Sequence, residues 1–374
     1  MRPAPFALER YFARYEFSAP YLLSSSDCDG LPMREVLAMA DEECRALWND
    51  LRLGYTESLG LPQLRAEIAD MYEEATADDV ITGAPEELIF VAMNALLRPG
   101  DRVVCTYPGY QSLFEVARAI GCVVDLWQPR EQGSWRFDPD ELHGILRPGT
   151  RLVVVNFPHN PTGALPGRDE WDAVLAAARG AGARVFSDEM YRLLEYAPAD
   201  RLPAACEAAA DAVTLSGMSK VFGMAGTRIG WLVTRDREAL EAFATFKDYT
   251  TICSSAPSEV LALIGLRARA ALVERHRARL ARNLAALEGF VARHGERFAL
   301  VPPRAGRVCL LRLRDGHATA FCRRAVEEAG IMLAPSTVFH FGDEHVRIGL
   351  GRENMPDVLA RLEAWLARTG RGAC

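Results

Sequence analysis

Lys220 and Arg228 are the residues whose types and spacing most directly suggest chemistry. They stand in the stretch Ser-Gly-Met-Ser-Lys220-Val-Phe-Gly-Met-Ala-Gly-Thr-Arg228. A buried lysine beside another cation has a lowered pKa, so its neutral amine can attack an aldehyde and form an imine. The arginine can hold a phosphate through two parallel hydrogen bonds. Only two of the 43 basic residues are lysine, Lys220 and Lys247, and arginine cannot form an imine in their place.

Other catalytic motifs do not fit this stretch. A Ser-x-x-Lys pair is excluded because Gly217 stands three residues before Lys220. The chain has no Gly-x-Gly-x-x-Gly loop, no P-loop and no His-Glu-x-x-His motif. Its nine cysteines include no Cys-x-x-Cys pair, so neither a metal site nor a redox dithiol is predicted.

Further polar motifs follow other apolar runs. Asn156-Phe-Pro-His-Asn160-Pro-Thr-Gly163 follows one, and Ser187-Asp188-Glu-Met-Tyr191 and Tyr107-Pro-Gly-Tyr110 follow two more. Thr82-Gly-Ala-Pro-Glu-Glu87 opens a predicted helix, whose first N–H groups and dipole can bind phosphate. Each motif alone has a structural explanation, such as a simple turn for Asn-Pro-Thr-Gly.

Together, in this order and at these spacings, the motifs resemble those of the class I/II aminotransferases, which are fold-type I enzymes dependent on pyridoxal phosphate (PLP). The resemblance runs from about Tyr55 to Arg347. It implies that Lys220 carries the cofactor as a Schiff base and then acts as a general base on the substrate. It also implies that Asp188 pairs with the pyridine nitrogen and keeps it protonated, so that the ring can withdraw electrons.

The same resemblance assigns other contacts of the cofactor ring and of the substrate. Asn160 and Tyr191 would bind the ring oxygen, and Tyr110 would stack on the ring. Arg347 matches the arginine that clamps the substrate α-carboxylate, with Asn160 beside it. Tyr55 matches a tyrosine that reaches the phosphate of the neighbouring subunit, which implies a homodimer with shared active sites.

The phosphate site departs from the family pattern at two positions. Pro85 has no N–H to donate at the start of its helix, so the backbone donors there would have to be Ala84 and Glu86. Gly217 stands where many relatives have Ser or Thr as a phosphate ligand, so a neighbouring serine would have to substitute. The resemblance then implies phosphate contacts from Gly83, Ala84, Pro85, Ser216, Ser219 and Arg228.

The PLP motifs leave the reaction open between two outcomes. Transfer of the amino group to an α-keto acid is the commoner chemistry in this family. The stretches 151–161 and 247–250 are also similar to capreomycidine synthases, which cyclise β-hydroxyarginine. Ser26, Asp27 and Asp29 lie in an entrance segment whose two carboxylates could receive a guanidinium, although capping of a helix at Met33 explains them equally well.

The framework that positions these residues is predicted from alternating apolar runs. Residues 80–233 alternate short strand-like runs with helical patterns, which predicts an α/β lobe with a largely parallel sheet. The later runs 308–313, 331–334 and 346–350 predict a smaller α+β lobe. We therefore expect the fold-type I PLP-transferase architecture, with a mainly parallel sheet of the seven-stranded type. Residues 41–285 would form the large PLP-binding domain, and residues 1–40 and 286–374 the small one.

The composition of the chain indicates which partners and which cellular compartment to expect. The net charge of −7 argues against nucleic acid or an anionic membrane as a partner. No apolar run is long enough for a membrane span, and residues 1–17 lack the apolar core of a signal peptide. The scattered cysteines read as reduced thiols of a cytoplasmic protein. A regulator that fuses this fold to a DNA-binding module is not expected, because no such domain fits before Tyr55.

Overall fold

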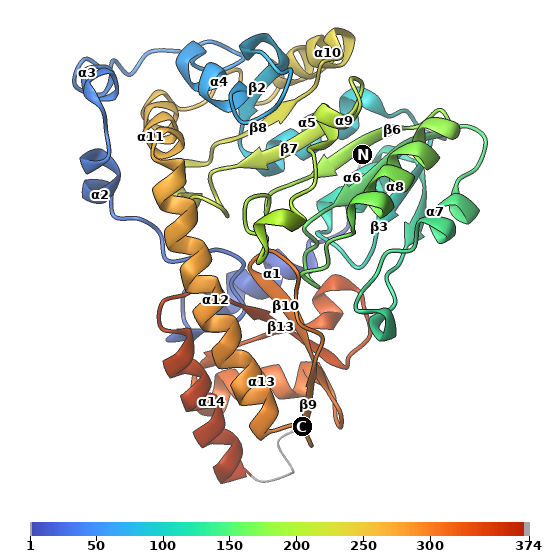
Figure 1. Cartoon of the computed structure of the whole chain (residues 1–374), viewed down its shortest axis with the longest axis vertical. Helices are drawn as coiled ribbons and strands as arrows, with labels where there is room; N and C mark the ends of the chain where they lie inside the picture. Colours follow the sequence, from blue (N-terminus) through green and yellow to red (C-terminus); the bar gives the residue numbers. More distant parts are fainter. Residues whose placement is uncertain (1, 370–374) are drawn as a thin grey trace.

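The large lobe of the computed structural model is built on one seven-stranded sheet (Figure 1). The structure describes residues 2–369. Strand β8 runs antiparallel to both of its neighbours, β2 and β7, and all other pairs are parallel. This confirms the predicted, mainly parallel sheet. In spatial order its strands are β2 (Val80–Gly83), β8 (Gly230–Val233), β7 (Val213–Gly217), β6 (Arg184–Asp188), β5 (Thr150–Asn156), β3 (Arg102–Thr106) and β4 (Val123–Trp127).

Both faces of this sheet are covered, which explains the continuous apolar character of its strands. Along β5, Leu152 and Val154 belong to one buried cluster, and Val153 and Val155 belong to another. The first cluster includes side chains of α5 (Pro85–Leu96), α6 (Ser112–Ile120) and α10 (Arg237–Lys247). The second includes side chains of α7 (Pro139–Ile145), α8 (Arg168–Gly180) and α9 (Ala205–Ala208).

The small lobe is an antiparallel sheet covered by two helices. Its strand order is β12 (Ala334–Pro335), β13 (His345–Gly349), β10 (Val308–Leu313) and β9 (Phe298–Leu300). Its helices α13 (Ala318–Ala329) and α14 (Met355–Thr369) pack on each other. The N-terminal β1 (Tyr21–Leu22) pairs in parallel with β11 (Ile331–Met332), so the start of the chain is held by the small lobe.

A long helix, α12 (Arg269–Arg293), runs from the large lobe into the small lobe (Figure 1). It follows α11 (Ala256–Arg267), which packs on α2 (Met33–Ala38), α3 (Glu42–Asn49) and α4 (Pro62–Ala69). The domain boundaries expected at residues 40 and 285 stay predictions, and the second of them lies within this continuous helix. No helix of the described chain is both long and apolar enough to cross a membrane.

Helix α1 (Ala7–Tyr15) was not expected from the sequence, and it joins the two lobes. Leu8 and Phe12, four residues apart, bury themselves in a cluster with small-lobe side chains. The hydroxyl of Tyr11 donates to the carbonyl oxygen of Leu333 at 2.7 Å. On the other side, the backbone N–H of Ala7 donates to Oε1 of Gln111 at 2.9 Å, just before α6. The helix is therefore fixed at the seam between the lobes.

Candidate active site

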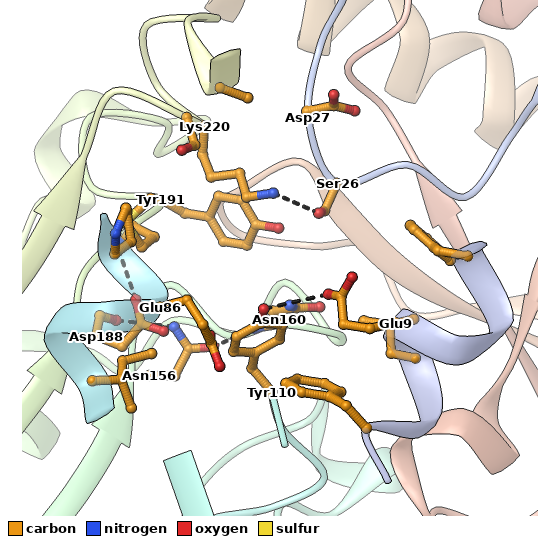
Figure 2. Close-up of a pocket in the computed structure, with 18 of the residues that line it drawn as sticks. Glu9, Ser26, Asp27, Glu86, Tyr110, Asn156, Asn160, Asp188, Tyr191 and Lys220 are labelled. Atoms are coloured by element: carbon orange, nitrogen blue, oxygen red, sulfur yellow. Dashed lines mark hydrogen bonds between the residues drawn. The ribbon is translucent and has the colours of Figure 1, made fainter. Parts of the chain in front are cut away.

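A cavity of about 660 Å³ lies between the lobes, and most of the residues expected at the site line it (Figure 2). Its walls come from the carboxyl ends of β5, β6 and β7, the start of α5, helix α1, and β13 of the small lobe. The expected residues among its lining are Ser26, Asp27, Pro85, Tyr110, Asn160, Asp188, Tyr191, Ser219, Lys220, Arg228 and Arg347.

The parallel sheet brings the first polar motifs together, because neighbouring parallel strands end at the same edge. Asn156 ends β5 and Asp188 ends β6, and the two residues are paired in the sheet register. Nδ2 of Asn156 donates to the backbone oxygen of Asp188 at 2.9 Å. Oδ1 of Asn156 accepts the backbone N–H of Asn160 at 2.8 Å, which fixes the turn that carries Asn160 into the cavity.

Asp188 is a buried carboxyl group, with 5% of its surface exposed. Burial raises its pKa to about 7, although a hydrogen bond from the backbone N–H of Met190, at 3.1 Å, opposes the rise. A carboxylate in this position is stabilised by a cation placed against it. A protonated ring nitrogen in the cavity would be such a cation.

Lys220 extends its amine into the cavity from the turn that follows β7 (Figure 2). Its Nζ donates to Oγ of Ser26 at 2.8 Å. Burial lowers the pKa of Lys220; the charge of Asp27 opposes this effect, and that of Arg347 adds to it. The neutral amine needed for attack on an aldehyde is therefore favoured relative to a lysine in water.

The hydroxyl of Tyr191 is buried and has no hydrogen-bond partner within residues 2–369. Burial raises the pKa of Tyr191 to about 12, so the phenol remains protonated and can donate a hydrogen bond. A buried donor without an acceptor costs free energy, so an acceptor oxygen in the cavity would stabilise it. This orphan hydroxyl fits the ring oxygen of PLP.

Arg347 holds a fixed orientation at the small-lobe side of the cavity. It is fully buried, with its guanidinium carbon 5.4 Å from the ring centroid of Phe12 and 5.1 Å from that of Phe339. Nε and one terminal nitrogen donate to the backbone oxygen of Ser24 at 3.1 and 2.8 Å. The other terminal nitrogen donates to Oδ1 of Asn160 at 3.3 Å, so Asn160 and Arg347 form one polar unit. Such a unit can orient a carboxylate.

The part of the cavity where the phosphate was expected is lined by the start of α5, Ser219 and Arg228, and it differs in part from the expectation. Gly83 and Ala84 precede the helix but are not among the lining residues. Ser216 is turned away, because its hydroxyl donates to the backbone oxygen of Glu189 at 3.4 Å. Of the two serines considered as substitutes, only Ser219 lines the cavity.

Gly217, one of the two departures from the family pattern, is explained by close packing. A β-carbon on Gly217 would lie 2.9 Å from Cα of Gly230 and 3.1 Å from Cγ of Pro85. Real side chains do not approach backbone atoms so closely, so the neighbouring strand β8 leaves no room for a side chain at residue 217, and the ring of Pro85 adds to the crowding. The two departures from the family pattern therefore lie next to each other in the structure.

The two aspartates expected to receive a substrate guanidinium already receive one from this chain. One terminal nitrogen of Arg352 lies 3.1 Å from Oδ1 of Asp27, and the other lies 3.4 Å from Oδ1 of Asp29. Arg279 also pairs with Asp29, at 3.5 Å. Asp27 lines the cavity, whereas Asp29 does not, so the hypothesis that both await a cationic substrate does not match this geometry.

Tyr55, expected to serve a neighbouring subunit, lies outside the cavity and is 89% exposed. Several lining residues were not expected from the sequence, and most of them come from α1 and its ends, a segment without a recognisable motif. The only available signal was the spacing of Glu9 and Glu16, which are seven residues apart and so fall on one helix face. The unexpected lining residues are Phe6, Leu8, Glu9, Arg10, Phe12, Glu16, Ile89, Asn156, Met190, Leu215 and Ala225.

Within residues 2–369, no group of three or more His, Cys, Asp or Glu side chains is placed to hold a metal ion. The buried carboxyl of Asp188, the orphan hydroxyl of Tyr191 and the amine of Lys220 instead face one cavity. These donors and acceptors fit PLP.

Comparisons with known proteins agree with this chemistry. The family described as Aminotransferase class I and II matches residues 20–362. The valine–pyruvate aminotransferase of Mycobacterium tuberculosis is 30% identical over 334 residues, covering 84% of each chain. The capreomycidine synthase of Streptomyces vinaceus is 29% identical over 329 residues, covering 84% of this chain and 81% of that protein. A PLP-dependent aminotransferase from Streptococcus suis superposes with a TM-score of 0.92 at 25% identity, covering 99% of this chain and 100% of that one. The chain belongs to the class I and II aminotransferases, and it is a PLP-dependent enzyme that acts on the amino group of an amino acid.

Proposed function

We propose that this aminotransferase moves the amino group of an amino acid to an α-keto acid in the cavity around Lys220. The observation that carries the proposal is the arrangement of Lys220, Asp188 and Arg347. An amine, a buried carboxyl and a buried guanidinium line one cavity between the lobes, and all three come from different elements. Each group has one part of the chemistry to perform.

When PLP is bound, it supplies an electron sink for the electrons released at the substrate α-carbon. Asp188 would hold the proton on the ring nitrogen, and Tyr191 would donate its hydroxyl hydrogen to the ring oxygen. Arg347 and Asn160 would bind the substrate carboxylate and orient the α-hydrogen toward Lys220. Lys220, with its lowered pKa, would take that proton as general base and return it at the other carbon.

The second candidate function is a cyclase of the capreomycidine synthase type, acting on a β-hydroxylated arginine by loss of the hydroxyl. It is favoured by the 29% identity to capreomycidine synthase along most of the chain. The two candidates share the groups around Lys220 and differ in their co-substrate. A transaminase needs an α-keto acid, whereas the cyclase needs a leaving group on the substrate β-carbon.

Separating the two half-reactions tests the proposal. The holoenzyme is mixed with one equivalent of an amino donor, and its visible absorbance band should fall while one equivalent of α-keto acid product appears. Adding a second α-keto acid should restore the band and release the matching amino acid, as expected of a ping-pong enzyme. Complete turnover of a β-hydroxylated arginine to a cyclic product without any keto acid would favour the cyclase instead.

We also propose that the enzyme is a cytoplasmic homodimer with active sites at the subunit interface. Leu53, Tyr55 and Tyr249 are each at least 87% exposed, which is unusual for apolar side chains of this size. The segments that carry them lie side by side, since Oγ of Ser58 donates to Oδ1 of Asp248 at 3.1 Å. A second subunit would cover this surface. The eight described cysteines are all unpaired, in keeping with a reducing compartment.

A further inference from the structure

Helix α1 forms the wall of the cavity that faces the substrate rather than the cofactor. It is anchored to the small lobe through Phe12 and Tyr11, and to the large lobe through Phe6, whose ring centroid is 5.0 Å from that of Tyr110. Figure 2 shows Glu9 pointing from this helix into the cavity, toward Tyr110 and Asn160. The wall is therefore positioned by contacts on both sides.

Glu9 and Glu16 are the carboxylates of this wall. They are seven residues apart, which places them two helical turns apart on the same face, and both line the cavity. Within residues 2–369 neither takes part in an ion pair. Oε1 of Glu9 accepts only a long hydrogen bond from the Tyr110 hydroxyl, at 3.4 Å. Both side chains are half-buried rather than free in solvent.

The other carboxylates of the cavity are already engaged. Asp27 is paired with Arg352, and Asp188 lies at the cofactor end. Glu86 accepts a hydrogen bond from the hydroxyl of Ser112 at the start of α6. The carboxylates of α1 differ from Asp27 because no cation among residues 2–369 contacts them, and they differ from Asp188 and Glu86 in lying on the α1 wall.

The cations that line the cavity act on the α1 carboxylates only at a distance: Arg347 and Lys220 interact electrostatically with Glu9, but neither forms an ion pair with it. Arg347 is turned toward the backbone of Ser24 and toward Asn160, and Arg228 lies at the phosphate end. Arg10 is exposed, so water screens its charge. Burial raises the pKa of Glu16, and the negative charges of Asp27 and Glu9 raise it further, whereas Arg352 and Lys220 oppose the rise. A cationic group beside Glu16 would relieve this repulsion.

We propose that Glu9 and Glu16 form a subsite for a cationic side chain of the amino donor, a guanidinium or an ammonium group. The proposal rests on the proposed function, because Arg347 and Lys220 define where the α-carboxylate and the α-amine of the substrate lie. With these two ends fixed, the side chain is directed along the α1 wall. Anionic side chains are repelled there, and neutral ones leave the two carboxylates without a partner.

Arginine and citrulline provide the test, because they have nearly the same shape and differ in charge. The holoenzyme should have at least about tenfold higher kcat/KM for arginine than for citrulline, as expected for a charge-assisted hydrogen bond. The variant Glu9→Gln/Glu16→Gln should lose at least about tenfold in kcat/KM for arginine and stay within about twofold for citrulline. Each single substitution should have an intermediate effect.

Glu288→Gln is the matched control, since Glu288 is an exposed glutamate of α12 outside the cavity. This substitution should change neither the kcat/KM for arginine nor the kcat/KM for citrulline. Equal kcat/KM for arginine and citrulline in the wild type, or an unchanged arginine preference in the double variant, would overturn the subsite. Thermal melting of the double variant checks that α1 stays in place.

Calorimetric titration of the holoenzyme with the two amino acids, without any α-keto acid, repeats the comparison under conditions where at most one half-reaction can occur. If neutral donors are transaminated and the substitutions have no effect, the subsite is wrong and the proposed function stands. If no donor is transaminated but arginine binds more tightly than citrulline and this preference disappears in the double variant, the subsite stands and transamination is wrong.

Discussion

The two ends of the cavity are built in different ways. At the cofactor end, Asn156, Asp188 and Lys220 sit at the ends of neighbouring strands or directly after them, and one continuous sheet fixes their spacing. At the substrate end, Ser26, Glu9 and Arg347 come from three separate stretches of chain: a loop, a helix and a strand of the small lobe. Only long-range contacts hold these stretches together.

This difference separates reaction chemistry from substrate choice. A change in the sheet would move several catalytic groups at once, whereas a change in α1 would alter the substrate wall and leave Asp188 and Lys220 in place. Relatives whose names state different substrates and reactions fit such a division. The two ends should therefore respond independently to substitution.

The largest effect is expected at the cofactor end, from Lys220→Ala. The variant should lose at least about a thousandfold in rate, because one substitution removes both the imine-forming amine and the general base. It should also lose the covalent attachment of PLP after borohydride reduction, as measured by mass spectrometry. Lys247→Arg is the control: Nζ of Lys247 donates to the backbone oxygens of Ser58 and Ile252, away from the cavity. If the covalent attachment of PLP after borohydride reduction is lost in Lys247→Arg, the assignment of Lys220 is wrong.

At the substrate end, Arg347→Lys should lower kcat/KM by about a hundredfold, mainly through a higher KM. A lysine cannot keep the bonds to Ser24 and Asn160 while presenting a flat fork between Phe12 and Phe339. Steady-state kinetics and the absorbance of the bound cofactor are the measurements. The cofactor band should be unchanged, because the substitution is confined to the substrate end.

Arg361→Lys is the matched control for this variant. Arg361 also stacks on an aromatic ring, with its guanidinium carbon 4.4 Å from the centroid of Tyr21, and it donates to the backbone oxygen of Ala329. Since Arg361 lies outside the cavity, Arg361→Lys should leave KM unchanged. Its only effect should be on the stability of the fold. If Arg347→Lys leaves KM unchanged as well, another group binds the α-carboxylate.

The same division explains how much could be predicted from the sequence. The parallel sheet was predictable because buried strands give continuous apolar runs, and the polar motifs follow those runs directly in the chain. The family resemblance then placed most of the cofactor-end residues on one cavity. The roles assigned to individual residues remain predictions.

The substrate end could be predicted only in part, because its contacts join distant positions. The pair between Asp27 and Arg352 spans 325 residues, and nothing local to Asp27 reveals that its carboxylate already has a partner. Helix α1 is short, and its amphipathic pattern does not indicate which lobe its face covers. The need for glycine at residue 217 likewise depends on Gly230, a residue of a neighbouring strand that it meets only after folding.

The last prediction concerns the stability of the apo-protein, where the buried carboxyl of Asp188 has no ring nitrogen as a partner. Its pKa is about 7 in the folded chain against 3.8 for the free side chain, so between these values the folded state holds a proton that the unfolded state releases. Wild-type stability should therefore fall as the pH rises through this window. Asparagine cannot titrate, so the free energy of unfolding of Asp188→Asn, relative to that of wild type, should rise by about 1.4 kcal/mol per pH unit between pH 5 and pH 7. Above pH 7 the difference should level off.

Urea unfolding of both apo-proteins at pH 5, 6, 7 and 8 measures this difference. The exposed Asp211→Asn serves as the control and should follow the wild type at every pH. Adding PLP should stabilise the wild type more than Asp188→Asn, because a protonated ring nitrogen stabilises the carboxylate of the wild type but not the amide of the variant. If the gap between Asp188→Asn and wild type is independent of pH, Asp188 is already charged in the apo-protein. The cofactor end would then be held by a second, unrecognised cation and would no longer be a site completed by PLP.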